Sequence, residues 1–347
     1  MPVTVIVGGQ YGSEGKGKVA HRLAIDCNAT TAVRTGGPNA GHTVIDQSDH
    51  PLVLRQLPTA ALIPNVKCIL GPGSYIDPDI LLQEVLRTGL TDDRLLIDPN
   101  AIVITADDKE RERQSGLRES IGSTQSGTGA AVVKRLGRRA ESALAKNDAR
   151  LSRFIKSVSA TLRSELNRGG RVILEGTQGF GLSPLHSLTY PYVTSRDTTA
   201  AAFVSEAGLS PVDVDEVVMV LRAFPIRVSG NSGPLLNEID WATLTIESSS
   251  PTQIMEYTSV TKSVRRVARF DVNIVRQAIE VNAPTHIVLN HLDYVDYSCR
   301  EHDSASDKAL QFVERIELLL GSRIDYLGFS PTSLVRRDHS ARRAKSA

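Results

Sequence analysis

The amino-acid sequence predicts an α/β fold, a mostly parallel central sheet flanked by helices and carrying elaborated loops. Three observations predict it. Short β-branched runs alternate with longer stretches of helical period along the chain. Several of these runs, such as Val3–Val7, are almost entirely apolar, which is typical of strands covered on both faces. The first run leads into a glycine-rich turn, GGQYGSEGKGK (Gly8–Lys18), and then into a helical pattern, as in parallel α/β sheets.

The expected elements follow from the two periods, taken in chain order. Apolar runs bounded by turn residues predict strands over Thr4–Gly8, Leu52–Leu57, Cys68–Leu70, Leu95–Ile97, Ile102–Thr105, Arg171–Glu175, Val217–Ala223 and His286–Asn290. Apolar residues at spacings of three and four predict helices over Lys16–Ile25, Asp79–Arg87, Ala106–Arg118, Leu151–Asn167, Phe270–Val281 and Ser306–Leu320. The sequence contains no internal repeat and no low-complexity linker, so we expect a single domain over residues 1–347.

The composition narrows the class of protein. A chain of 347 residues with 41% hydrophobic residues can bury a large core. Its net charge is +1, from 40 basic and 39 acidic residues, so the sequence lacks the excess of positive charge typical of proteins that bind duplex nucleic acid or an anionic membrane surface. The cysteines Cys27, Cys68 and Cys299 form neither a disulfide framework nor a zinc pattern. With no apolar run of spanning length and no secretory signal pattern, these features favour the cytoplasm.

The glycine-rich turn indicates a phosphate-binding loop. A strand, a glycine-rich turn and a helix start together present backbone N–H groups to an anion, and Lys16 adds a positive charge. The loop is not a Walker A motif, because Gly9 to Gly15-Lys16 is one residue too long and Gly17 stands where Ser or Thr would bind magnesium. An ordinary tight turn is the alternative, which the density of glycine and lysine makes less favourable. The loop therefore predicts phosphate binding in a different family.

Six ordered motifs resemble those of the adenylosuccinate synthetase family. The loop resembles the family's G-x-Q-W-G-D-E-G-K-G-K, with serine at position 13 in place of aspartate. The other motifs are RTGGPNAGHT (Arg34–Thr43), IGSTQSGTG (Ile121–Gly129), LEGTQGFGL (Leu174–Leu182), YPYVTSRDTTA (Tyr190–Ala200) and TSVTKSVRRVARFD (Thr258–Asp271). The chain is similar in length to the compact archaeal members. The resemblance implies a P-loop-related fold and a ligase that joins L-aspartate to C6 of a purine nucleotide after a nucleoside triphosphate has phosphorylated the 6-oxygen.

The resemblance also implies the catalytic and donor-binding residues. Catalysis would involve Ser13, Lys16 and His42, with His42 as the general acid at the 6-oxygen; a structural histidine in a tight turn is the alternative. Mg²⁺ would be bound at Ser13 and at the Gly41 carbonyl. The triphosphate would contact the residues Ser13, Glu14, Gly15, Lys16, Gly17, Gly41, His42 and Thr43.

The acceptor nucleotide and the oligomer follow from the same resemblance. The acceptor would contact Ser13, Asn39, Thr124, Gln125, Arg138, Gln178 and Thr194. In the family, the residue matching Arg138 reaches in from a neighbouring subunit, which implies a homodimer. The alternative for Arg138 is a solvated position in the basic stretch RLGRR (Arg135–Arg139).

The aspartate loop departs from the family pattern. It would comprise Ser259, Val260, Thr261, Lys262, Ser263, Val264 and Arg265, with Arg265 as a bidentate carboxylate clamp. Where the family reads T-G-R-P-R-R, this chain has Ser263 in place of the first arginine. In the family that arginine lies near the ribose 2′-hydroxyl, so Ser263 removes a reason to prefer a ribonucleotide.

The donor-base segment departs as well. The family's T-K-x-D reads here Asn290-His291-Leu292-Asp293, which keeps the acid that reads guanine but replaces the lysine with His291. The turn at Gly328 and Ser330 matches the family's S-T-G-P only loosely. ATP or dATP therefore becomes a plausible donor beside GTP.

Ser13 raises three interpretations, since in the family the aspartate takes the N1 proton and binds magnesium. The chain could be an inactive nucleotide-binding paralogue, or an ordinary enzyme acting on IMP with another base such as Glu14. Alternatively, a smaller hydroxyl leaves room for the 2-amino group of guanine. Together with Ser263, this third interpretation favours dGMP, as in a branch of the family encoded by bacteriophages that place 2-aminoadenine in their DNA. The expected product is N6-succino-2-amino-2′-deoxyadenylate, made in the host cytoplasm if the chain is phage-encoded.

Overall fold

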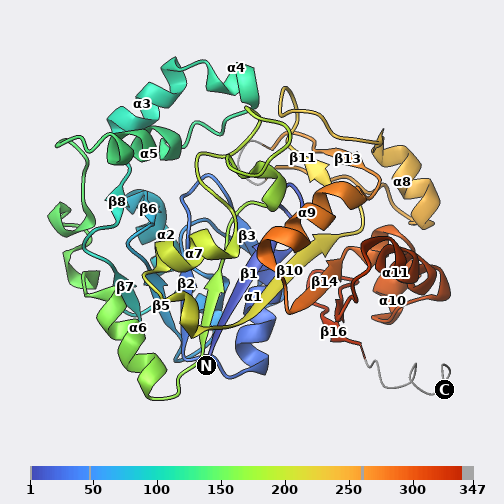
Figure 1. Ribbon diagram of the computed structural model, residues 1–347, viewed down its shortest axis with the longest axis horizontal. Helices are drawn as coiled ribbons and strands as arrows, with labels where there is room; N and C mark the ends of the chain where they lie inside the picture. The colour runs from blue at the N-terminus through green and yellow to red at the C-terminus, as the bar shows by residue number, and fades with distance from the viewer. Residues whose placement is uncertain (1, 47, 259–261, 338–347) are drawn as a thin grey trace.

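A nine-stranded sheet runs through the computed structural model, which describes residues 2–46, 48–258 and 262–337 (Figure 1). Neighbouring strands are parallel, except that β16 at one edge is antiparallel to β15. In spatial order the strands are β16 (Val335–Arg336), β15 (Tyr326–Leu327), β14 (His286–Asn290), β10 (Val214–Arg222), β1 (Val3–Gly8), β9 (Val172–Glu175), β2 (Thr31–Arg34), β5 (Lys67–Leu70) and β7 (Leu95–Ile97).

Smaller sheets and the helices complete the structure. Two antiparallel sheets consist of β3 (His42–Ile45) with β4 (Pro51–Leu54), and of β11 (Ile226–Arg227), β13 (Arg266–Ala268) and β12 (Glu238–Ile239); β6 (Tyr75–Ile76) pairs in parallel with β8 (Ile102–Val103). The α-helices are α1 (Lys16–Asp26), α2 (Pro78–Thr88), α3 (Ala106–Gln114), α4 (Leu117–Ile121), α5 (Thr128–Leu136), α6 (Val158–Asn167), α7 (Ala200–Ala207), α8 (Trp241–Ser248), α9 (Val272–Asn282), α10 (Ser298–His302) and α11 (Asp307–Leu320). Short 3₁₀ turns lie at Thr59–Leu62, Ala145–Asn147, Ser152–Phe154, Phe180–Leu182, Pro211–Asp213 and Leu292–Tyr294.

Helices cover both faces of the large sheet, which explains why its strands are apolar throughout. Val3, Val5 and Val7 of β1 point to one face and belong to one hydrophobic core with residues of α6, α7, α9 and α11. Ile6 points to the other face and packs with Val19 and other residues of α1. Each such side chain, once buried, contributes about 1.5–3 kcal/mol. The predicted α/β fold with a mostly parallel, doubly covered sheet is therefore confirmed.

The element boundaries differ from the expectation at several points. The helix expected over Ala106–Arg118 ends at Gln114, because Gly116 adopts φ 67° and separates α3 from α4. The helix expected from Leu151 begins only at Val158, after a 3₁₀ turn and a bridge from Ile155 to the edge strand β7. The strand expected over Leu52–Leu57 ends at Leu54. Strand β2 was not expected from its short sequence TAVR.

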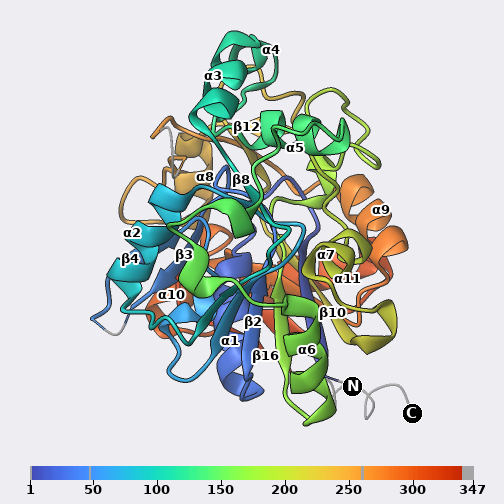
Figure 2. The same cartoon turned by 90° about the vertical axis from the view of Figure 1, so that its left-hand side faces the viewer.

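The carboxyl ends of the parallel strands face the part of the molecule that carries α3, α4, α5 and the β11–β13 sheet. These elements lie at the top of Figures 1 and 2, opposite the amino terminus. In α/β sheets, ligands bind beyond the carboxyl ends of the strands. Within the described residues, no helix has the length and apolar character needed to cross a membrane.

Candidate active site

The phosphate loop joins β1 to α1 and contains three residues in the left-handed region. Gly12 and Gly15 have φ 90°, and Ser13 has φ 57°. The loop packs tightly against the segment after β9, since a Cβ on Gly8 would lie 2.8 Å from the Gln178 carbonyl oxygen. Ser13 lies exposed at the crest of the loop, and its carbonyl accepts a hydrogen bond from Arg222 Nη1 at 3.0 Å.

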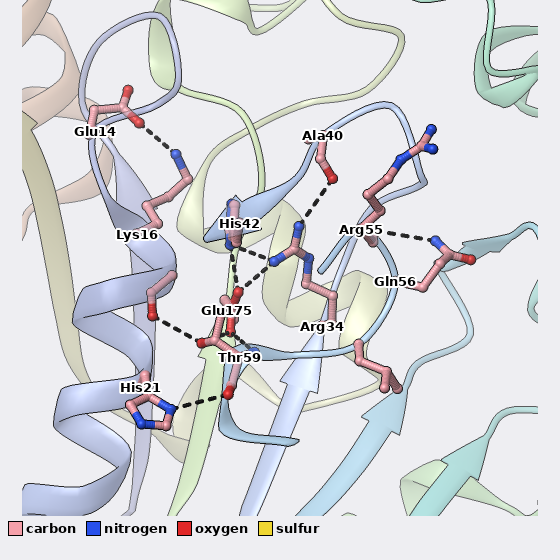
Figure 3. A network of polar contacts seen from close by, with 12 residues as sticks. Glu14, Lys16, His21, Arg34, Ala40, His42, Arg55, Gln56, Thr59 and Glu175 are labelled. Carbon is pink, nitrogen blue, oxygen red and sulfur yellow. Dashed lines mark hydrogen bonds and ion pairs between the residues drawn. The ribbon is translucent and has the colours of Figure 1, made fainter. Parts of the chain in front are cut away.

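Glu14 and Lys16 face into the loop and form a buried ion pair. Lys16 Nζ lies 2.5 Å from Glu14 Oε2 (Figure 3). Glu14 Oε1 accepts hydrogen bonds from the backbone N–H groups of Gly12 and Gln10 at 2.8 and 3.2 Å. The Glu14 carboxylate thus holds the loop's own backbone. This arrangement disfavours Glu14 as a substitute base, because its oxygens already accept three hydrogen bonds.

His42 begins β3 and is held by two buried charged residues. Arg34 Nη1, His42 Nδ1 and Glu175 Oε1 lie 2.5 Å from one another (Figure 3). The other oxygen of Glu175 accepts hydrogen bonds from the N–H and the hydroxyl of Thr59, both at 2.8 Å. Arg34 Nη2 also donates to the Ala40 carbonyl at 3.5 Å, which ties it to the turn before His42.

Burial and charge set the protonation of this cluster. Burial, and then the Arg34 guanidinium, lower the pKa of His42 to about 3, so the imidazole is neutral near pH 7. Burial raises the pKa of Glu175, but Arg34 and the hydrogen bond with His42 outweigh it and lower that pKa to about 2. With Nδ1 occupied by Arg34 and Glu175, Nε2 is the ring nitrogen left to meet a substrate.

The segments expected to hold the acceptor converge around the start of α5. A Cβ on Gly37 would lie 2.7 Å from Thr128, and one on Gly129 would lie 3.8 Å from Ser195. These contacts bring the turn that carries Asn39 and the loop that carries Thr194 next to α5. The half-buried residues Thr124 and Gln125 precede it, and Gln125 has φ 54°.

Two further acceptor candidates, Gln178 and Arg138, have left-handed backbone conformations. Gln178 (φ 59°) lies against Gly12, placing it beside the phosphate loop. Arg138 is exposed just after α5, with φ 52°. The helix start itself is already occupied, because the N–H groups of Gly127 and Gly129 donate to Glu112 at 2.7 and 2.5 Å.

The expected donor-base residues lie together beside the phosphate loop. Asn290 Nδ2 donates to the Glu14 carbonyl at 2.7 Å, and Leu292 N–H donates to the Gly328 carbonyl at 3.1 Å. Lys18 Nζ donates to the Ser330 carbonyl at 2.9 Å. The structure thus joins the segments 290–293 and 328–330 to the loop and to α1.

The ionisable groups of this segment are strongly shifted. Burial raises the pKa of Asp293 to about 6, against the opposing effects of Arg300 and Lys18. Burial, and then Arg222, hold the pKa of His291 well below its usual value, so the imidazole is neutral. The His291 ring lies 5.1 Å from the Tyr294 ring.

Paired positions hold the described residues of the expected aspartate loop. Tyr257 and Val264 form an antiparallel bridge, and the Ser263 N–H donates to Thr258 Oγ1 at 3.1 Å. Lys262 is exposed and has φ 55°. Arg265 Nε donates to the Tyr257 carbonyl at 3.2 Å. Ser259, Val260 and Thr261 lie outside the described residues.

Three charged residues that were not predicted from the sequence organise the site: Arg34, Glu175 and Arg222. Each is the last residue of a parallel strand, β2, β9 and β10 respectively. A charge that ends an apolar strand run is the signal that could have found them, since the carboxyl ends of neighbouring parallel strands meet at one edge. In the described residues, no group of three or more His, Cys, Asp or Glu side chains could hold a metal ion.

Comparisons with known proteins agree with this geometry. A family model described as adenylosuccinate synthetase matches residues 5–144 and 139–298. The adenylosuccinate synthetase of Methanocaldococcus jannaschii is 38% identical over 94% of this chain and 94% of its own length. That of Pyrococcus horikoshii is 34% identical, covering 95% of this chain and 96% of its own.

Two solved structures are also similar. The succinoaminodeoxyadenylate synthetase (PurZ) of cyanophage S-2L, bound to dGMP and to dATP as an energy donor, has a TM-score of 0.83 and 31% identity, covering 99% of this chain and 97% of its own. The fully ligated adenylosuccinate synthetase of Plasmodium falciparum, at 21% identity, shares the fold with a TM-score of 0.84 and covers 97% of this chain and all of its own. With its family model, its relatives and its phosphate loop in agreement, this chain belongs to the adenylosuccinate synthetase family and is a carbon–nitrogen ligase.

Proposed function

We propose that the enzyme joins L-aspartate to C6 of dGMP through a 6-phosphoryl intermediate, giving N6-succino-2-amino-2′-deoxyadenylate for 2-aminoadenine nucleotide synthesis. Ser13 carries this proposal. It lies exposed at the crest of the phosphate loop, where a carboxylate would crowd a purine with a 2-amino group and a hydroxyl can accept its hydrogen bond. The cyanophage S-2L enzyme, solved with dGMP, supports the same acceptor.

The arrangement of His42 suits a group that stabilises charge on the 6-oxygen. Arg34 can donate to Nδ1, and in that tautomer Nε2 carries the proton and would act as the donor to the substrate. A nucleoside triphosphate would lie along the loop from Ser13 to Gly17, under Gly41 and Thr43. Lys16 would then exchange its contact with Glu14 for the β- or γ-phosphate. Phosphate then leaves C6 as the aspartate amine attacks.

Magnesium would be held mainly by the nucleotide. Mg²⁺ usually keeps several waters and binds substrate phosphates with one or two protein ligands. The Ser13 hydroxyl and the Gly41 carbonyl would supply those ligands here, because the Glu14 carboxylate is engaged with the loop. Such a set fits an ion that arrives with the triphosphate and neutralises charge on the phosphoryl group.

We propose ATP or dATP as the donor. A neutral His291 beside Tyr294 occupies the position of the family's lysine and offers a ring for stacking on adenine. The cyanophage S-2L enzyme was solved with dATP as energy donor. Asp293, the acid that would read guanine, is present, so GTP is the alternative donor.

The second candidate function is ordinary adenylosuccinate synthesis from IMP. The archaeal relatives, at 34–38% identity, carry that name. Ser263 favours the deoxynucleotide instead, because its hydroxyl pairs with Thr258 at 3.2 Å within the aspartate loop and adds no long cation near the sugar.

We propose a homodimer in which Arg138 reaches the acceptor phosphate of the neighbouring subunit. Arg138 is exposed directly after α5, and that helix exposes Val133 and Leu136 by 70% and 75%, an apolar face that a partner could cover. Mixing inactive Arg138→Ala with inactive His42→Ala chains tests this, since hybrid dimers regain one complete site. No recovery on mixing would contradict a shared site. We propose that the enzyme acts in the cytoplasm, and in that of the host if a phage encodes it.

The deciding experiment is phosphate release with L-aspartate, Mg²⁺ and ATP, comparing dGMP with IMP as acceptor. Release with dGMP alone supports the proposal, and mass spectrometry should identify the succinylated product. Release with IMP alone returns the chain to ordinary adenylosuccinate synthesis. Silence with both acceptors, repeated with dATP and GTP, leaves an inactive paralogue.

A further inference from the structure

Arg222 is a fully buried arginine that the reaction as proposed does not use. Its backbone is fixed by Gln10, whose side chain accepts from the Arg222 N–H at 2.9 Å and donates to the Arg222 carbonyl at 3.1 Å. Its guanidinium donates to the Ser13 carbonyl at 3.0 Å and to both carboxylate oxygens of Glu256. One side chain therefore joins the phosphate loop to the segment that leads into the aspartate loop.

Glu256 in turn holds the residue expected to clamp aspartate. The Arg265 N–H donates to the Glu256 carbonyl at 2.9 Å, and Arg265 Nε lies 4.0 Å from Glu256 Oε2. Among the described residues, the Nη atoms of Arg265 donate no hydrogen bond, so its outer edge remains available to a carboxylate. Two arginines share one glutamate, which leaves a surplus positive charge beside the loop.

A third segment meets the same carboxylate. The Tyr294 hydroxyl donates a hydrogen bond to Glu256 Oε1 at 3.0 Å. Tyr294 directly follows Asp293 of the donor-base segment. Burial raises the pKa of Glu256, but Arg222, with Arg265, outweighs it and lowers the pKa to about 2. The carboxylate is therefore ionised throughout the working pH range.

We propose that Glu256 is a positioning residue for aspartate binding. Arg222 connects Glu256 to the phosphate loop, through its hydrogen bond to the Ser13 carbonyl. Glu256 orients Arg265 through its carbonyl and carboxylate. Arg222 sets the position of Glu256 relative to the loop that holds the acceptor and the triphosphate. The inference rests on the proposed ligase function but holds for either acceptor, because it concerns the aspartate site.

The test is Glu256→Gln, which keeps the shape and removes the charge. We expect KM for aspartate to rise about tenfold or more, while KM for the acceptor and the donor each change by less than about threefold. Positional isotope scrambling of the triphosphate without aspartate, which reports 6-oxygen phosphorylation, should stay near the wild-type rate. Arg222→Lys should lower both scrambling and aspartate use, since it disturbs the Ser13 turn as well.

The matched control is Glu317→Gln. Glu317 lies on α11 and forms another half-buried ion pair, with Arg337 at 2.5 Å, which this substitution weakens. It should leave KM for aspartate unchanged. Equal rises in all three KM values, or an unchanged KM for aspartate, would overturn the proposal. If Glu256→Gln does not fold, Tyr294→Phe removes one hydrogen bond to Glu256 and should still raise KM for aspartate by about two- to fivefold; no rise would overturn the proposal.

The assay uses whichever acceptor the wild-type enzyme accepts. Inactivity of the wild-type enzyme with both dGMP and IMP would contradict the proposed function alone. In that case, calorimetric titration of aspartate into the nucleotide-bound wild-type and Glu256→Gln proteins still decides the role of Glu256. Equal dissociation constants would overturn it.

Discussion

The Nδ1 atom of His42 lies 2.5 Å from Oε1 of Glu175, and both side chains are buried. Arg34 Nη1 lies 2.5 Å from each of these two atoms, and its donation to Nδ1 leaves the proton of the neutral ring on the other nitrogen, where it is available for chemistry. Arg34 shares both atoms and keeps the carboxylate ionised. This cluster, rather than His42 alone, defines the group that would meet the 6-oxygen.

Glu175→Gln should lower turnover by roughly 10²-fold, the lower end of what general acid–base catalysis contributes. The amide cannot hold both Arg34 and His42, so the ring loses its orientation while nucleotide contacts remain. Steady-state kinetics should show kcat falling with little change in KM for the acceptor. Asp213→Asn is the control, because it breaks a bidentate pair with Arg163 at the opposite, amino end of β10. If kcat fell as much in Asp213→Asn, the loss of turnover in Glu175→Gln would be attributed to a general disturbance of folding.

The stability of the protein should fall as the pH decreases from about 6.5 towards 2. His42 has a folded pKa of about 3 against a usual 6.5, so the unfolded state binds its proton first as the pH falls. Glu175, with a folded pKa of about 2 against 4.5, acts in the same direction at lower pH. Each of the two groups contributes on the order of 1 kcal/mol per pH unit to the loss of stability, in the range between its folded and its unfolded pKa.

Urea unfolding at pH 7 and pH 4.5 measures this dependence. The His42→Gln variant has no imidazole at this position to take up a proton on unfolding. Its free energy of unfolding should therefore fall less between pH 7 and pH 4.5 than that of the wild type. The exposed ion pair of Arg111 and Asp107 offers a control in Arg111→Gln, which should keep the wild-type slope. Equal slopes for wild type and His42→Gln would contradict a neutral, buried His42.

How far the sequence predicts this site depends on whether the contacts are local. The phosphate loop, with Ser13 in it, follows from a strand, a turn and a helix that are adjacent in the chain. The cluster of Arg34, His42 and Glu175 does not, because it requires β9 to lie between β1 and β2, an order set by packing across the sheet. The start of α6 was misplaced for a similar reason, since the residues before it pair with the edge strand β7.

Ser13→Asp should reduce kcat/KM for dGMP by about tenfold or more and leave IMP use unchanged or improved. The carboxylate would face the 2-amino group, which IMP lacks. Aspartate tolerates the left-handed backbone better than most residues, so φ 57° at this position should not prevent folding. Ser13→Ala, which removes only the hydroxyl, is the matched control and should cost dGMP less than Ser13→Asp does. Unchanged dGMP kinetics in Ser13→Asp would remove the steric argument.

Donor selection should depend on the ionisation of Asp293. Guanine presents N1–H and N2–H₂ as donors, which a carboxylate accepts and a protonated acid does not. Since burial raises the pKa of Asp293 to about 6, the ionised fraction falls about tenfold between pH 7 and pH 5. The affinity for GTP relative to ATP should fall by a similar factor in competition binding over that range. Asp293→Asn should show a flat ratio, whereas Asp303→Asn, which removes a nearby exposed acid, should keep the wild-type dependence. A GTP-to-ATP ratio that is constant with pH in the wild type would mean that Asp293 does not read the donor base.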